Sequence, residues 1–143
     1  MHAPDATTSP IRFERLAGSR IVATPAALNE LSRPTDSIAL RFAPDELYVT
    51  PPLEASDLAR LAAADPHAII VSEMAFSGAW LEEDHARRLF ERYAEWEMPP
   101  KGTQAQFVQG SVAGVATKIY FAAGNVLLLV QSPYAHELEE RLT

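Results

Sequence analysis

Histidine and carboxylate side chains carry most of the reactive chemistry in this chain, because its 143 residues contain no cysteine. That absence excludes disulfides, thiolate nucleophiles and cysteine metal sites. A catalytic triad needs a nucleophile, a base and an orienting acid. No histidine has such partners at a meaningful spacing, so we interpret the histidines as structural or exposed and name no catalytic residue. The four are His2, His67, His85 and His136.

An acidic run followed by a histidine, Glu82-Glu83-Asp84-His85, is the nearest approach to a metal site. Divalent cations need ligands that converge from a loop or from several elements. Consecutive positions of a helix instead point about 100° apart, and carboxylates at a helix start are favoured by the helix dipole. We predict no metal site. The glycines of 110–114 lack the lysine of a phosphate-binding loop and are interpreted as turn residues.

The net charge of −7 restricts the classes of partner. Lys101 and Lys118 are the two lysines, and the chain has no basic run, which argues against nucleic acid and anionic membranes as partners. Apolar residues make up 48% of the chain, as expected for a globular protein. The longest apolar run, 126–130, is too short to cross a bilayer. The N-terminus does not resemble a signal peptide, so we expect a cytoplasmic protein.

The clearest structural element is a β-hairpin over residues 38–49. Apolar and polar residues alternate on both sides of the segment Ala43-Pro44-Asp45-Glu46. A proline and acidic residues between two alternating stretches are typical of a tight turn that joins two strands. This hairpin fixes the middle of the predicted fold.

The other predicted elements mix strands and helices along the chain. Alternation with period two predicts strands, and apolar spacing near 3.6 predicts helices. Strands are expected over 11–16, 20–24, 67–71, 76–81, 105–111, 115–121 and 126–131, with a turn at Gly18-Ser19 and a hairpin linking 67–71 to 76–81; helices are expected over 53–64 and 83–96, after Thr24-Pro25 and after Ser132-Pro133. This order predicts an α+β fold with largely antiparallel sheets and packed helices. We expect a single domain over residues 11–143, behind a flexible tail over residues 1–10.

Large aromatic side chains indicate core positions and one partner surface. Trp80 and Trp96 are interpreted as core and helix-end anchors, and Tyr134 is expected to be buried by the last helix. Trp96 also lies close to Met98 and Pro99. These three residues are predicted to form an exposed apolar patch, which would mark a partner surface.

The order of these pieces resembles the gamma subunit of heterotetrameric sarcosine oxidase and, more distantly, the folate-binding T-protein of the glycine cleavage system. The hairpin over 40–49, Leu-Arg-Phe-Ala-Pro-Asp-Glu-Leu-Tyr-Val, is similar to the family's apolar–Ala-Pro-Asp-Glu–apolar hairpin. The other matching segments are the strand 68–72, the segment 76–81, the Ala-Arg helix start at 86–89, the closing strands 115–121 and 126–131, and the helix start Ser-Pro-Tyr-Ala at 132–135.

This resemblance implies a T-protein-like fold and a structural role. Gamma subunits of this family are assembly subunits without known catalytic residues, so the chain alone is expected to bind no cofactor. FAD, FMN, NAD and tetrahydrofolate are expected in larger flavoenzyme subunits, which would be its partners. Such enzymes oxidatively demethylate N-methylated amines such as sarcosine and pass the one-carbon unit to tetrahydrofolate.

Two alternatives stay open. The chain could be a free-standing folate-binding protein, with Glu46 or Glu73 as the acidic residue that grips the pterin. It could also be a small enzyme with an unrecognised site, which would need a histidine or carboxylate with a strongly shifted pKa inside a cleft. Of these interpretations, the resemblance favours a non-catalytic subunit of an oxidoreductase complex over an enzyme that acts alone.

Overall fold

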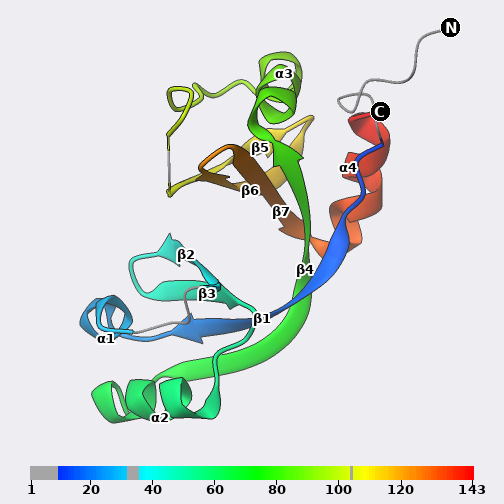
Figure 1. The fold of residues 1–143 in the computed structure, drawn as a ribbon. Helices are drawn as coiled ribbons and strands as arrows, with labels where there is room; N and C mark the ends of the chain where they lie inside the picture. The colour runs from blue at the N-terminus through cyan, green and yellow to red at the C-terminus, as the bar shows by residue number, and fades with distance from the viewer. Residues whose placement is uncertain (1–9, 32–35, 104) are drawn as a thin grey trace, which may run out of the picture. The chain divides into compact units, whose positions relative to one another are not determined.

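The predicted α+β class is confirmed. The computed structural model describes residues 10–31, 36–103 and 105–143. Seven strands form one sheet in the order β2-β3-β1-β4-β7-β6-β5 (Figure 1). The pairs β1–β3, β2–β3, β4–β7, β5–β6 and β6–β7 are antiparallel. The elements are β1 (Glu14–Val22), α1 (Pro25–Asn29), β2 (Ile38–Ala43), β3 (Glu46–Thr50), α2 (Ala55–Ala64), β4 (Ile69–Glu82), α3 (Glu83–Tyr93), β5 (Gln106–Val112), β6 (Val115–Ala122), β7 (Asn125–Gln131), the 3₁₀ turn η2 (Ser132–Tyr134) and α4 (Ala135–Arg141).

The chain divides into two compact units. One unit is Leu16–Ala75, and the other contains Phe76–Thr143 together with the N-terminal segment up to Arg15. The strand β4 contributes its first half to one unit and its second half to the other. The single domain expected over residues 11–143 stays a prediction. Nine of the ten residues of the expected tail, 1–9, lie outside the described residues.

The unit Leu16–Ala75 is built around the predicted hairpin. Strands β2 and β3 pair as expected, with an irregularity between Arg41 and Ala43. One face of this unit's sheet packs on α1 and α2, and the buried core there contains Ile21, Leu47, Val49, Leu28 and Leu61. The helix α1 starts as its sequence predicts, because Thr24 caps it and Pro25 occupies its first position.

The turn expected at Gly18-Ser19 is wrong, because β1 runs through it. Gly18 lies under the ring of Tyr48, where a Cβ atom would come within 2.5 Å of that ring. The Ser19 hydroxyl accepts a hydrogen bond from the backbone N–H of Leu53 at 2.9 Å. Both residues therefore serve close packing inside a strand, although their types are typical of turns.

In the other unit, β4, β7, β6 and β5 form consecutive antiparallel pairs. The three predicted closing strands are confirmed. The turn between β5 and β6 consists of Ala113 and Gly114, which both have positive φ, 50° and 81°. This is the backbone conformation that the tightest hairpin turns require. Phe90 of α3 and Leu138 of α4 are buried in the core that covers one face of these strands.

The hairpin expected between residues 67–71 and 76–81 is wrong, because residues 69–71 and 76–81 belong to the single strand β4. Figure 1 shows this strand uninterrupted. The residues between the two segments, 72–75, include no glycine, proline or asparagine to turn the chain. The second half of β4 pairs with β7 instead, from Phe76 opposite Gln131 to Glu82 opposite Asn125.

Two aromatic residues expected in the core are exposed. Trp80 is 51% exposed, because Ala79 and Leu81 on either side of it point into the core and strand side chains alternate. Tyr134 is 49% exposed. It ends the 3₁₀ turn η2, so it does not share the helical spacing that buries Leu138.

Candidate functional site

The two glutamates predicted as pterin-binding candidates both form ion pairs with the guanidinium of Arg20. Arg20 of β1 donates from Nε to Glu46 Oε2 at 2.7 Å, and its Nη1 lies 3.9 Å from Glu73 Oε1. About a fifth of each glutamate side chain is exposed. The structure thus brings Glu46 and Glu73 together on one face of the unit Leu16–Ala75. Arg20, which joins them, was missed from the sequence.

The cluster of Arg20, Glu46 and Glu73 keeps an excess negative charge, because two carboxylates share one guanidinium. Glu73 Oε1 is buried and accepts no hydrogen bond from the described part of the chain, although Arg20 is within ion-pair range. A buried acceptor without a hydrogen bond is costly. The exposed parts of the two carboxylates can still accept a positive charge from outside the chain.

Beside this cluster lies the buried ring of Tyr48. The ring stacks on Phe42, with centroids 5.6 Å apart and planes 7° from parallel. Burial raises the pKa of the Tyr48 hydroxyl, and the nearby charge of Glu73 raises it further. The raised pKa keeps Tyr48 neutral, so it is not poised as a base.

The predicted partner patch lies at the end of α3. Trp96 and Met98 are half-buried against the core of their unit, and Pro99 is buried. The Trp96 Nε1 donates to the carbonyl of Ser111 at 2.9 Å, and its ring centroid lies 5.2 Å from that of Phe90. These contacts hold the Trp96 side chain against its unit. Its role as a partner surface stays a prediction.

The acidic run at the start of α3 is used for structure. Glu83 Oε2 accepts the backbone N–H of Gly102 and the Nε of Arg87, each at 2.9 Å, and these two bonds lower the pKa of Glu83. Lys101 lies 2.8 Å from Asp84 and lowers the pKa of Asp84. Lowered values are opposite to what a general acid at neutral pH needs. Among the residues that the structure describes, no three metal-ligating side chains converge.

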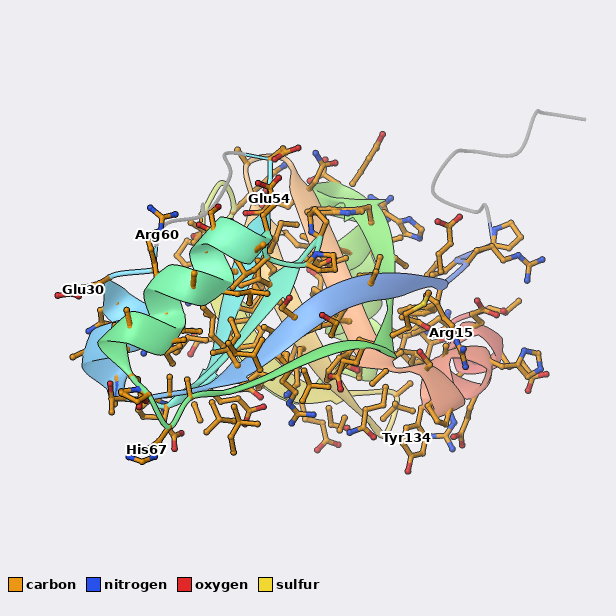
Figure 2. The ribbon with its side chains drawn as sticks, turned by 90° about the horizontal axis from the view of Figure 1, so that it is seen from below. Arg15, Glu30, Glu54, Arg60, His67 and Tyr134 are labelled. Carbon is orange, nitrogen blue, oxygen red and sulfur yellow. The ribbon has the colours of Figure 1, made fainter. Side chains whose placement is uncertain are left out.

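The histidines are dispersed over the described elements. Figure 2 shows His67 at the turn that leads from α2 into β4, and its backbone N–H donates to Asp65 at 3.0 Å. His136 lies on the exposed side of α4, with Nε2 at 3.1 Å from Glu140. His85 lies in the first turn of α3, and His2 lies outside the described residues. The structure does not bring the described histidines together.

A cleft of about 740 Å³ lies over β5, β6 and the end of β7, beside α4. Its charged side chains are tied within the unit. Lys118 donates to the amide oxygen of Gln109 at 2.6 Å, and Arg141 donates to the carbonyl of Ala113 and to Glu137. The cleft has polar and apolar walls, and Tyr134 lies at its side.

None of the described helices is both long and apolar enough to span a membrane.

Comparison with known proteins shows a likeness of fold. No protein-family model matches the chain, and no curated protein matches it in sequence. Among solved structures, the chain is similar to a chain of the heterotetrameric sarcosine oxidase from Corynebacterium sp. U-96, which was solved in complex with pyrrole 2-carboxylate. The TM-score is 0.73 at 13% sequence identity, and the match covers 92% of this chain and 80% of that chain. This likeness shows that the chain has a sarcosine-oxidase-like fold.

Proposed function

We propose that this chain is a non-catalytic, gamma-type subunit of a heteromeric, flavin-dependent N-methyl amine oxidase or demethylase that serves one-carbon metabolism. The observation that carries the proposal is the likeness to a chain of heterotetrameric sarcosine oxidase over 92% of this chain. In the proposed complex, FAD, FMN, NAD and tetrahydrofolate are bound by larger partner subunits in the cytoplasm. This chain stabilises the assembly.

The chemistry of the described carboxylates supports an assembly role. Asp65, Glu83 and Asp84 are the acids with a clear pKa shift, and in each the shift is downward. The cause in each case is a partner that ties two segments of the chain together. Asp65, for example, accepts the backbone N–H groups of Thr24 and His67. These carboxylates stabilise the fold, and their oxygens are already engaged within the chain.

Co-expression tests the proposal. The tagged chain is co-expressed with the proteins encoded by the neighbouring genes, captured by its tag, and examined by absorbance spectroscopy. We expect a yellow complex that contains this chain in a fixed ratio to the flavin-binding subunits. A stable monomer that leaves every encoded large subunit behind would contradict the proposal.

A free-standing folate-binding protein is the second candidate, and the meeting of Glu46 and Glu73 at one place favours it. Two carboxylates on one face could grip the amino groups of a pterin if Arg20 moved aside. A ligand at 100 times its dissociation constant stabilises a protein by about 2.7 kcal/mol. Tetrahydrofolate should therefore raise the melting temperature of the isolated chain, and Glu46→Gln with Glu73→Gln should abolish the rise. No rise with the wild-type chain would exclude this candidate.

A further inference from the structure

Side-chain alternation places an apolar strip beside the Arg20 cluster. Residues two apart in a strand share a face, so Val22 lies on the face of Arg20, while Ile69 and Val71 lie on the face of Glu73. Arg20 contacts Glu73 across neighbouring strands, so all these residues share one face of the sheet. The residues between them confirm the alternation, because Ile21 and Ile70 pack on the opposite side, against the core.

The three aliphatic residues are also neighbours on that face. Figure 1 shows β1 running toward α1 and β4 running away from α2, so the two strands run in opposite directions. With Arg20 beside Glu73, a step of two residues forward on β1 and two back on β4 brings Val22 near Val71. We call the surface formed by Val22, Ile69 and Val71 the β1–β4 strip.

The β1–β4 strip is exposed to an extent that is unusual for aliphatic strand residues. Ile69 is 60% exposed, Val71 45% and Val22 38%. Neighbouring exposed aliphatic side chains on a sheet mark an interaction site or an aggregation hazard. The exposed apolar start of β4 has the character of an interaction surface.

The charge beside the strip indicates what kind of molecule covers it. The Arg20 cluster holds two carboxylates against one guanidinium, and about a fifth of each glutamate side chain is exposed to a partner. A partner surface with an arginine or lysine among apolar residues would complement this charge. A second copy would bring an identical acidic cluster on a chain of net charge −7, so like charges would face each other across a symmetric contact.

We infer that the β1–β4 strip is the docking site for a larger subunit of the oxidase, whose contacting surface is apolar with a basic side chain placed opposite Glu46 and Glu73. This inference rests on the proposed function and adds the surface and the chemistry of the contact to it. A lysine placed in the strip would remove an apolar contact with the partner, and its ammonium group would have to be dehydrated on binding.

The test compares two lysine substitutions on the same strand in the co-expressed complex. Val71→Lys changes the strip, whereas Met74→Lys changes a residue that is 52% exposed on the opposite face of β4. We expect Val71→Lys to weaken binding of the large subunit by at least about tenfold, and Met74→Lys to leave binding unchanged. Glu73→Gln should weaken it less and reduce its dependence on salt. Circular dichroism confirms that each variant folds, and Ile69→Ser replaces Val71→Lys if that variant does not.

The outcomes distinguish failure of the docking site from failure of the proposed function. Failure of the wild-type chain to capture a flavin-binding subunit removes the proposed function. Capture by the wild-type chain and equally by Val71→Lys overturns the docking site alone. Loss of binding in both lysine variants overturns the assignment to one face. A dimer of the isolated chain that Val71→Lys dissociates assigns the strip to a second copy and also overturns the inference.

Discussion

Asp65 joins the end of α2 to the start of α1, and it contributes to the pH dependence of stability. Its carboxylate accepts the backbone N–H groups of Thr24 at 2.9 Å and His67 at 3.0 Å, and these bonds lower the pKa of Asp65. A lowered pKa in the folded state means that the charged form stabilises the fold above the unfolded pKa. This stabilisation is lost as the pH falls through the folded pKa.

Asp65→Asn should therefore lower the melting temperature at neutral pH, and the difference from the wild-type chain should shrink as the pH falls below about 4. The asparagine offers one acceptor oxygen to two N–H donors. Asp45→Asn is the matched control, because Asp45 is exposed on the hairpin turn. Melting curves from pH 7 to pH 3 measure both differences. A constant difference across this range would show that the charge of Asp65 is not the cause.

Gly18 has a packing role that a turn glycine would not have. A Cβ atom at this position would come within 2.5 Å of the buried Tyr48 ring. Gly18→Ala should lower the free energy of unfolding by about 1–3 kcal/mol, the usual cost of overpacking. Urea unfolding measures this cost, and it should be smaller in a Tyr48→Leu background, where the ring is gone. Equal costs in both backgrounds would contradict the role of the ring.

At the level of single residues, the sequence indicated which residue types could bind a ligand but not which residues contact one another. Glu46 and Glu73 could be named as acids on strands, but they lie 27 positions apart and Arg20 lies on a third strand. Only strand pairing brings Arg20 to both. The available signal was the alternation in β1, which places Arg20 and the apolar Ile21 on opposite faces of the strand. The turn expected at Gly18-Ser19 separated Arg20 from the first half of this strand.

The helix α3 holds the segment that follows it through one buried carboxylate. Glu83 accepts the N–H of Gly102, and Arg87, which Glu83 orients, donates to the carbonyl of Pro99 at 2.7 Å. Glu83→Gln should speed hydrogen exchange of the Gly102 amide by about tenfold, since a hydrogen bond to a charged group is stronger than one to a neutral amide. The exposed neighbour Glu82 provides the control Glu82→Gln. Unchanged exchange in Glu83→Gln would show that other contacts hold the segment.

At the level of elements, short-range patterns predicted the strands correctly where typical turn residues stood between them. Pro44 and Asp45 marked the hairpin of β2 and β3, and Gly114 marked that of β5 and β6. The strand β4 was divided in two because Ser72 and Glu73 interrupt its apolar residues. In a strand that is exposed in its first half, polar residues do not end pairing, so local composition could not show its length.

At the scale of the whole molecule, the net charge of −7 should govern how fast the chain finds its partner. An acidic surface is steered toward a basic one, and salt screens this attraction because the Debye length falls from about 30 Å at 0.01 M to about 3 Å at 1 M. The association rate with the large subunit, measured by stopped flow, should fall at least about tenfold over this range, while dissociation changes less. Glu46→Gln with Glu73→Gln should flatten the salt dependence more than Glu137→Gln with Glu140→Gln on α4. An association rate that does not vary with salt would mean that the partner surface is not basic. The apolar contact of the β1–β4 strip would then have to provide recognition by itself.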